Sequence, residues 1–486
     1  MRYLVLLVVL PLLGAFLQPI VSRISAGLGR GFGPLILIVM AWIGIQAWDG
    51  TAQPVALDIG GFRPPFGIVF YIDHLALLFA LSVSIGALLL WPRGRRPDAV
   101  REYTLTLVLV AAASGLAISG DLFNLYVFYE LTSVAAYGLI AAQRTGACFA
   151  ASIRYVIVSS IGAVLALLGV ALIYLQAGSL NLAQLAQLAP ERLTGPVGLA
   201  AFVFLLIGFG VKAELFPVNT WVPEVYATAS RRVSALLAGV ISKLALLIVV
   251  RLLILVYHQE QAQMIMLTLG ILGIVTGELA AWRARDLTRM LAYSSIGQLG
   301  MIFVAFSIPG KAGVLAGLAV ALHHLVVKPA LFLLAEQWGG SLERLKGVAR
   351  QAPWAAVLFI VLALSMIGVP PLPGFWAKLL VMVHLMEQAH PLYYLGMAAI
   401  MLAAVVEASY LFRLITRFYE PRPEARTVPT HHLQDLGTAS LLGAALVVAA
   451  FYMGPLGDSL DEIAATAADT ASYIRIVAPE PSPDLE

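Results

Sequence analysis

Residues 354–386 read WAAVLFIVLALSMIGVPPLPGFWAKLLVMVHLM and are almost wholly apolar. About 20 apolar residues are enough for a helix to span a bilayer, so this stretch is too long for one straight span. Pro370, Pro371, Pro373 and Gly374 lie in its middle. Proline removes a backbone donor and clashes with the preceding helical turn. The stretch therefore predicts a membrane helix that is interrupted at its centre.

The composition of the whole chain agrees with a membrane protein. The chain has 486 residues, of which 60% are hydrophobic and only 12% are charged, and its mean hydropathy is +0.91. Soluble globular proteins carry about 25% charged residues. Cys148 is the one cysteine, which excludes a disulfide framework, an iron–sulfur cluster or a thiolate zinc site within this chain.

Over such long apolar segments in lipid, only helices form all the hydrogen bonds of their own backbone. We therefore expect an all-α polytopic membrane protein with about 14 transmembrane helices. No Ala-x-Ala-like cleavage site follows the first segment, so we interpret it as a helix rather than a signal peptide. The predicted helices cover residues 1–20, 31–48, 68–91, 102–119, 122–142, 151–176, 197–218, 233–257, 262–281, 288–307, 312–336, 354–386, 394–416 and 437–454.

Loop charge gives the predicted orientation. The loops after odd-numbered helices contain 19 basic residues and the opposite face contains 6. Because basic loops stay in the cytoplasm, both termini are expected on the outer, periplasmic side of a bacterial inner membrane. The first set is Arg23, Arg30, Arg93, Arg95, Arg96, Arg101, Arg144, Arg231, Arg232, Arg283, Arg285, Arg289, Arg344, Lys346, Arg350, Arg413, Arg417, Arg422 and Arg426. The second is Arg2, Arg63, Arg192, Arg251, Lys311 and Arg475.

A second interruption lies in the seventh helix, where Pro217 follows soon after Lys212. Interruptions in corresponding helices of two halves are typical of transporters built from inverted repeats. The seventh and twelfth helices stand five apart, so we predict repeats over 102–257 (helices 4–8) and 262–416 (helices 9–13). Residues 1–101 then hold helices 1–3, and 437–454 form helix 14. Residues 455–486 are expected to be an amphipathic helix on the outer face followed by a disordered tail.

Ionisable side chains fall well inside these apolar spans. A charged residue at a helix centre costs about 3 kcal/mol in translocon experiments, so six of them facing lipid would cost on the order of 15 kcal/mol. They are therefore expected to face the interior of the helix bundle. The six are Glu130, Lys212, Lys243, Lys328, Lys378 and Glu407, and His323 and His324 lie beside them in the eleventh span.

Two interpretations of these residues are open. Paired charges could lock helices together, but four lysines cannot pair one to one with two glutamates. Alternatively, burial brings lysine and glutamate pKa values toward the pH at which protons exchange, and such groups joined by water form a proton relay. The set as a whole favours transport.

Other polar residues have simpler interpretations. Asp73 opens the third span and Asp121 precedes the fifth, and both are expected to start a helix or lie at the interface. Glu278 lies near a span end, where solvation is the default. Glu214 has two equally weighted interpretations: it orients the helix break, or it lines the proton path. Adjacent histidines on a helix point about 100° apart, so a metal site at His323 and His324 is not expected. No phosphate-binding or dinucleotide-binding glycine motif occurs, and no cofactor is predicted.

Several ordered motifs carry a resemblance to a known family. They are YELTSVAAYGLI (129–140), VKAELFPVNTWVPEVY (211–226), VSALLAGVISKLALLIVVRLL (233–253), DLTRMLAYSSIGQLGMI (286–302), HHLVVKPALFLLA (323–335) and GVPPLPGFWAKLL (368–380). In these the chain resembles the antiporter-like, proton-conducting subunits of Mrp-type cation/proton antiporters (MrpA and MrpD) and respiratory complex I (the NuoL, NuoM and NuoN type).

The resemblance implies 14 transmembrane helices with broken helices 7 and 12. It places Glu130 and Lys212 as the family's fifth-helix glutamate and seventh-helix lysine. The resemblance also implies proton-transfer roles for six further residues, which are Lys243, His323, His324, Lys328, Lys378 and Glu407. At the position of Glu407, only some members of the family have an acidic residue.

The sequence departs from the complex I subunits after the seventh helix. Those subunits usually read His-Thr-Trp-Leu-Pro-Asp-Ala-His there, whereas residues 219–226 read NTWVPEVY and contain no histidine. This favours an MrpD-like subunit of a sodium/proton antiporter, with other membrane subunits as partners and protons and Na⁺ as transported ions. The alternative is a proton-pumping subunit of a complex I-like oxidoreductase or a group 4 hydrogenase complex. No catalytic redox site is expected in this chain.

Overall fold

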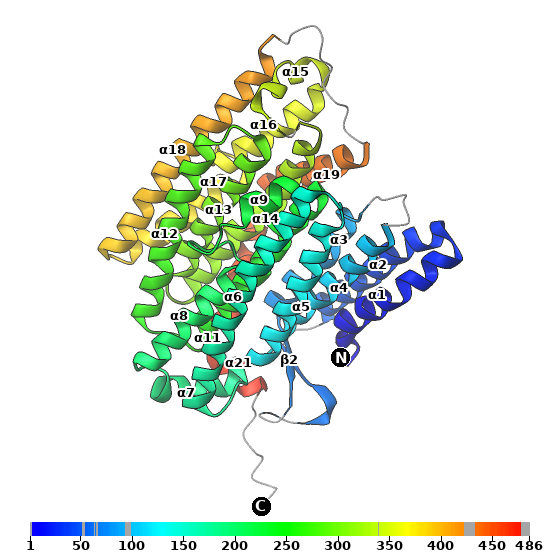
Figure 1. Ribbon diagram of the computed structural model, residues 1–486. Helices are drawn as coiled ribbons and strands as arrows, with labels where there is room; N and C mark the ends of the chain where they lie inside the picture. Colours follow the sequence, from blue (N-terminus) through cyan, green and yellow to red (C-terminus); the bar gives the residue numbers. More distant parts are fainter. Residues whose placement is uncertain are drawn as a thin grey trace, which may run out of the picture.

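The computed structural model describes residues 2–50, 54–62, 64, 67–92, 99–338, 340–421 and 433–477. Each of the fourteen predicted segments contains helix, and most of the long helices run in a common direction as one bundle (Figure 1). Ten helices of this described part are long and apolar enough to cross a membrane. Three shorter apolar helices are His74–Leu89, Pro196–Gly210 and Pro353–Ile367. The expectation of an all-α polytopic membrane fold is confirmed.

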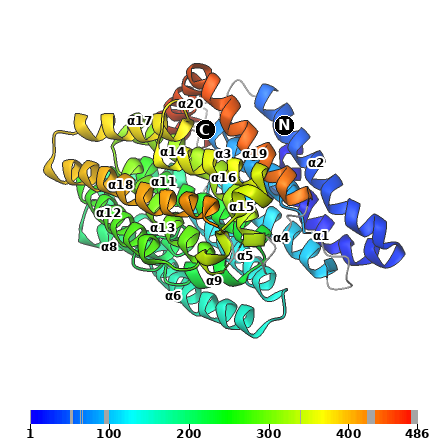
Figure 2. The same cartoon turned by 90° about the horizontal axis from the view of Figure 1, so that it is seen from above.

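The N-terminal elements form one edge of the bundle, where α1 and α2 pack on each other and against α4 (Figures 1 and 2). They are η1 (Arg2–Val5), α1 (Leu6–Ile24), α2 (Ala26–Gly50), β1 (Val55–Asp58), η2 (Ile59–Gly61), β2 (Val69–Ile72) and α3 (His74–Leu89). The next group is α4 (Ala99–Ile118), α5 (Leu122–Ala141), α6 (Gly146–Ala177), α7 (Leu182–Arg192), α8 (Pro196–Gly210), α9 (Val222–Thr228), α10 (Arg231–Leu236), η3 (Leu237–Ile241) and α11 (Ser242–Leu255).

The second half of the chain continues the bundle. Its elements are α12 (Glu260–Arg283), α13 (Leu287–Phe306), α14 (Gly310–Trp338), η4 (Leu342–Leu345), α15 (Val348–Gln351), α16 (Pro353–Ile367), α17 (Pro373–Glu387), α18 (Pro391–Tyr419), α19 (Leu433–Phe451), α20 (Met453–Ala468) and α21 (Thr470–Val477). The seventh and twelfth predicted helices are both interrupted, as α8 and α9 and as α16 and α17. The division into two inverted repeats stays a prediction.

The start of the third predicted helix is wrong. Residues 69–72 form strand β2 and pair antiparallel with β1, with Val55 opposite Ile72. The run Val-Phe-Tyr-Ile is β-branched or aromatic and suits a strand. Helix α3 begins only after Asp73, whose carboxylate accepts a hydrogen bond from the Ala76 amide at 2.7 Å. The same carboxylate pairs with buried Arg251 at 2.7 Å, so it does more than start a helix.

One further element differs from the expectation. Helix α7 is not predicted because it is short and much less apolar than the spans; Asn181 caps it through the amides of Ala183 and Gln184. The expected C-terminal helix is present as α20 and α21, which are separated at Asp469. Helix α20 packs against α14, with Lys311 and Asp461 paired at 2.7 Å. The predicted disordered tail at 478–486 lies outside the described residues.

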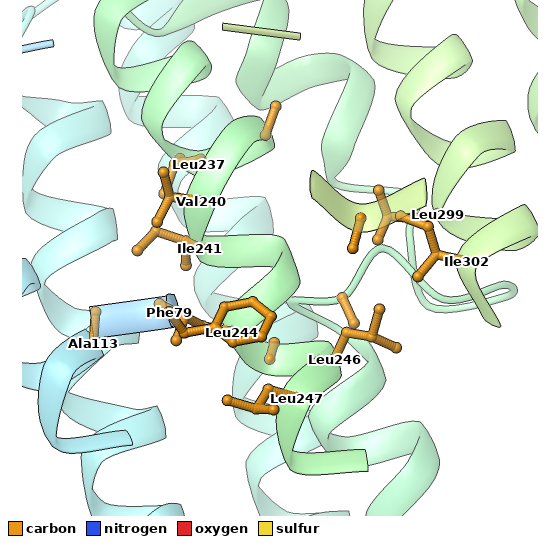
Figure 3. Packing of buried hydrophobic residues seen from close by; sticks show 14 of the residues in the cluster. Phe79, Ala113, Leu237, Val240, Ile241, Leu244, Leu246, Leu247, Leu299 and Ile302 are labelled. Atoms are coloured by element: carbon orange, nitrogen blue, oxygen red, sulfur yellow. The ribbon is translucent and has the colours of Figure 1, made fainter. Parts of the chain in front are cut away.

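The segment from α10 through α11 forms the centre of the core. It is buried along its length, so it is surrounded by protein. Leu244 lies on the side of Phe79 and Ala113, and Leu246 lies on the side of Leu299 and Ile302 (Figure 3). Charged side chains on this segment are therefore shielded from lipid.

Helices α12 and α13 make the closest packing in the fold, through glycines. A Cβ added at Gly277 would lie 2.4 Å from the Gly297 amide nitrogen, and one at Gly300 would lie 2.5 Å from the Ile274 nitrogen. Small residues allow backbones of membrane helices to approach closely, where van der Waals packing stabilises them. This contact brings Glu278 of α12 and Gln298 of α13 together at one cavity, which Lys378 of α17 and Glu407 of α18 also line.

We predict that Gly277→Ala separates α12 from α13 and destabilises the protein by about 1–3 kcal/mol, the usual effect of overpacking. The thermal unfolding midpoint of the detergent-solubilised protein should fall. Gly31→Ala is the matched control, because a Cβ there meets no atom within 4 Å. Equal midpoints for the two variants would contradict this account of the packing.

Candidate functional site

The first break places Lys212 against α5. Helix α8 ends at Gly210, and Lys212 lies in the non-helical turn that precedes α9. Its Nζ donates to the Tyr129 carbonyl oxygen at 2.7 Å and to the Ser133 hydroxyl, and it lies 3.1 Å from the centre of the Tyr129 ring. Tyr129 and Ser133 are one helical turn apart, so a single face of α5 provides every contact.

Glu130 is not the direct partner that the sequence suggested. No ion pair joins its carboxylate to Lys212, although it follows Tyr129 directly in α5. Glu130 is half-buried, and its buried Oε1 has no hydrogen-bond partner. The two groups are close neighbours whose charges interact across the backbone of α5.

Glu214 is the residue whose importance the sequence left open. It lies in the same break with a φ of 58°, a left-handed conformation that is uncommon for glutamate. It is buried, and its Oε1 accepts a hydrogen bond from the Tyr226 hydroxyl at 2.7 Å. Its buried Oε2 has no hydrogen-bond partner in the described part of the chain. The cations that act most strongly on it are Lys243 and then Lys328, so Glu214 joins the break to the bundle centre.

Lys243 follows the π-helical turn η3. Single π-turns within α-helices occur frequently at functional sites. The Lys243 Nζ donates to the Ala238 carbonyl oxygen and, at 3.0 Å, to the Ser242 hydroxyl. A cavity of about 10 Å³ also touches Lys243, and its other lining residues are apolar. Lys243 is thus held by neutral acceptors within its own helix.

Helix α14 carries the histidines and Lys328 and is continuous through Pro329. Gly239 of η3 packs against the Pro329 ring, where a Cβ on Gly239 would come within 2.4 Å. The Lys328 Nζ donates to the Leu291 carbonyl oxygen at 3.1 Å and to the Ser294 hydroxyl at 2.8 Å, both on α13. Lys328 is completely buried.

The two histidines have different surroundings. The His323 Nε2 lies 2.9 Å from the Ser365 hydroxyl at the end of α16, within hydrogen-bond distance. Both ring nitrogens of His324 are buried and have no hydrogen-bond partner among the residues that the structure describes. Buried polar atoms without protein partners are sites where ordered water binds. His324 therefore suits a water-mediated step.

The second break places Lys378 between a helix end and a carboxylate. Its Nζ donates to the carbonyl oxygens of Met366 at 2.6 Å and Ile367 at 3.2 Å, which belong to the last turn of α16. The last carbonyls of a helix are free and carry partial negative charge. Lys378 also pairs with Glu407 at 2.8 Å, and the other oxygen of Glu407 accepts from Gln298 at 2.9 Å.

The interpretation of Glu278 as a solvated residue is wrong. Its side chain is buried beneath α18, and its Oε2 accepts a hydrogen bond from the Tyr410 hydroxyl at 3.0 Å. With Gln298, Lys378 and Glu407 it lines a cavity of about 10 Å³, which is room for roughly one water molecule. The sequence showed this carboxylate in an apolar span but gave no sign that α18 covers the end of α12.

The added carboxylates change the charge balance. Four lysines meet four glutamates, so the surplus of cations expected from the sequence disappears. Only Lys378 forms an ion pair within this set; the acidic groups that act on Lys328 are Glu407, Glu278 and Glu214, from both sides of the bundle. The structure therefore joins the two breaks through one row of ionisable groups, which is Glu130, Lys212, Glu214, Lys243, His324, Lys328, His323, Glu278, Lys378 and Glu407.

Fold and site together define a multi-pass membrane protein with a row of ionisable groups buried in its interior. Residues 119–405 match the family model described as NADH:quinone oxidoreductase/Mrp antiporter, TM. The chain is 34% identical over 446 residues to NADH-quinone oxidoreductase subunit N of Desulforudis audaxviator, covering 87% of this chain and 88% of that protein. The chain belongs to this NADH:quinone oxidoreductase/Mrp antiporter family.

Relatives from different complexes are similar to it. It is 31% identical over 356 residues to the D-type subunit of the Na⁺/H⁺ antiporter of Alkalihalophilus pseudofirmus, covering 71% of this chain and 72% of that one. Its fold matches a chain of the membrane-bound sulfane sulfur reductase, an archaeal respiratory membrane complex, with a TM-score of 0.91 and 29% identity. That match covers 98% of this chain and 100% of the other.

We predict that Glu407→Ala destabilises the protein by about 3–5 kcal/mol, because it leaves the buried Lys378 cation without its anion. The double variant Glu407→Ala/Lys378→Met should recover most of this loss, since no unpaired charge remains. Thermal unfolding of the solubilised protein measures both. Asp461→Ala removes one member of an exposed pair and is the control, with an expected effect of about 0–1 kcal/mol. Additive effects of the two single substitutions would contradict the pairing.

Proposed function

We propose that this chain is a proton-translocating, antiporter-like subunit of a multisubunit membrane complex. The observation that carries the proposal is the row of buried lysines and glutamates that connects the two helix breaks. Ionisable groups inside a membrane protein are costly and mark ion or proton pathways. Family membership supports the same function, because the family unites antiporter and oxidoreductase membrane subunits.

The proposed mechanism begins at Glu130 and Lys212. Lys212 is held by a carbonyl and a hydroxyl rather than by a carboxylate, so either protonation state can be accommodated. An ionised Glu130 nearby favours the protonated lysine, and neutralising Glu130 favours release of the proton. A change in a neighbouring subunit that alters Glu130 would therefore alter the proton affinity of Lys212.

The proton then passes through the bundle centre. Glu214 lies in the break after Lys212, and Lys243 and Lys328 are the cations that act most strongly on it. Water at Glu214 and His324, both of which have buried atoms without a partner, would complete the hydrogen-bonded route. Lys378 and Glu407 form the terminal pair, where the charge is held until an exit opens.

The parent complex that fits best is an Mrp-type Na⁺/H⁺ antiporter with this chain as its D-like subunit. The similarity to the D-type subunit of an Na⁺/H⁺ antiporter supports this, as do the absent histidines in residues 219–226. The second candidate is a redox-driven complex, favoured by the similarity to an oxidoreductase subunit N and by the match to a sulfane sulfur reductase chain. Co-purifying subunits distinguish them: small membrane subunits in the first case, and iron–sulfur or flavin proteins in the second.

The orientation and the internal symmetry belong to the same proposal. The excess of basic residues on one face supports a bacterial inner-membrane protein with both termini on the periplasmic side. Helices 4–8 (102–257) and 9–13 (262–416) are proposed as inverted repeats. In that scheme Lys212 and Lys378 belong to equivalent breaks: Lys212 lies in the turn after α8, and Lys378 lies in the second turn of α17.

We predict that Lys212→Ala and Glu130→Ala lower ion translocation at least tenfold while the complex still assembles. Lys212→Arg is the sharper variant. Arginine keeps the charge but does not release its proton in proteins, so it should restore stability without restoring transport. Dissipation of an imposed pH gradient in vesicles containing the complex measures the activity.

Lys311→Ala is the control for these variants, because Lys311 forms only an exposed pair with Asp461. It should transport like the unmodified protein. Normal transport by Lys212→Arg would show that Lys212 supplies only a fixed charge, and the relay would then be wrong at this position.

We also predict that Glu214→Gln slows transport about tenfold or more. Glutamine keeps the hydrogen bond from Tyr226 but cannot ionise, so the link between the first break and Lys243 is lost. Glu191→Gln, at the exposed end of α7, is the matched control and should have no effect. Equal rates for both variants, in complexes of equal subunit content, would remove Glu214 from the route.

A further inference from the structure

A surface pocket with a volume of about 670 Å³ opens at the ends of α12 and α18, outside the row of buried charges. Its floor is fixed by backbone hydrogen bonds between two loops. The Leu287 amide donates to the Gly340 carbonyl at 3.0 Å, and the Leu342 amide donates to the Arg285 carbonyl at 3.2 Å. The pocket is thus held in place by two hydrogen-bonded loops and is not a gap beside a single loop.

The pocket is strongly basic. Four arginines and one carboxylate line it, namely Arg283, Arg285, Arg413, Arg417 and Glu343. Arg283 and Arg285 are exposed, and neither has an acidic partner within the described part of the chain. Arg413 donates to the Trp282 carbonyl at 2.7 Å, while its buried Nε has no acceptor among the described residues. The pocket therefore offers several donors to an anion.

Glu343 does not neutralise the two free arginines. Its carboxylate accepts hydrogen bonds from Lys346 and from Arg417. These bonds, chiefly that from Lys346, lower the pKa of Glu343 and keep it ionised at neutral pH. Because Glu343 is shared between two cations on its own side of the pocket, the charges of Arg283 and Arg285 remain available.

The pocket lies at the boundary between apolar and polar surface. Trp282 in its lining is 47% exposed, and Leu279, one turn earlier in α12, is 49% exposed. Exposed tryptophan at the end of a membrane helix is typical of the headgroup level. Beyond it, basic loop residues replace the apolar surface of α12.

We propose that this pocket binds the phosphate headgroup of an anionic membrane phospholipid. Arg283 and Arg285 bind the phosphate, since the guanidinium fork matches phosphate oxygens. The exposed apolar surface of α12 at Leu279 and Trp282 receives the acyl chains. Basic pockets between transmembrane helices are a known form of lipid headgroup site. The apolar surface beside the arginines favours a lipid over free phosphate or an acidic segment of a partner subunit.

The test uses the intact complex reconstituted in phosphatidylcholine nanodiscs with a photoactivatable phosphatidylglycerol. Cross-linked peptides from residues 279–289 and 341–346 are quantified by mass spectrometry. We expect labelling there by phosphatidylglycerol and not by an equivalent phosphatidylcholine probe. In Arg283→Gln/Arg285→Gln the apparent affinity should fall roughly 30-fold, from about 1 kcal/mol for each arginine near a charged membrane surface.

Two matched variants separate binding from folding. Arg23→Gln/Arg101→Gln removes two exposed arginines of the same predicted face outside the pocket, and labelling of the pocket peptides should not change. Glu343→Gln removes the one lining carboxylate and should raise the affinity about fivefold, a gain that a loosened fold would not produce.

Three results would overturn the proposal. Equal labelling of the arginine variant and the unmodified complex would exclude these arginines as ligands. Competition by millimolar inorganic phosphate would identify a free-phosphate site. Labelling that occurs only after another subunit is removed from the complex would show that a protein segment covers the pocket.

Discussion

The structure depends on how the ammonium groups of lysines inside the helix bundle obtain hydrogen-bond acceptors. A buried cation needs acceptors, and a main-chain carbonyl has two lone pairs, so it can accept from an ammonium group while it also belongs to a helix. All four buried lysines meet this requirement with a main-chain carbonyl. The acceptors are Tyr129 for Lys212, Ala238 for Lys243, Leu291 for Lys328 and Met366 for Lys378. Three of the lysines add a serine hydroxyl, and Lys378 adds Glu407.

Two of these acceptors lie at helix irregularities. The interruption after α16 leaves the carbonyls of Met366 and Ile367 free for Lys378. The π-turn η3 ends two residues before Lys243 and contains its acceptor. A neutral carbonyl or hydroxyl holds an ammonium group without fixing its charge state, unlike a carboxylate. The arrangement suits groups that exchange protons, and it leaves Lys378 as the one lysine of the row fixed by an ion pair.

Dense packing elsewhere makes the row possible. The glycine contact between α12 and α13 brings Glu278 against Gly297, and α18 then covers both helices with Glu407 and Tyr410. The wholly protein-enclosed segment from α10 to α11 keeps Lys243 away from lipid. Carboxylates from both halves of the chain therefore act on Lys328 at the centre. One rigid scaffold thus couples two helix breaks that are more than 150 residues apart in the sequence.

The sequence by itself determined the positions and the apolar nature of most membrane helices, both interruptions and most of the buried charges, because apolar length and proline act locally. Those features predicted Lys212, Lys243, Lys328 and Lys378 as interior residues. Only the tertiary structure decided which groups meet. It separated Lys212 from direct pairing with Glu130, buried Glu278 beneath α18 and placed Glu214 between the two halves. Such contacts depend on how helices that are distant in the sequence pack against each other, and no local sequence pattern encodes which helices pack together.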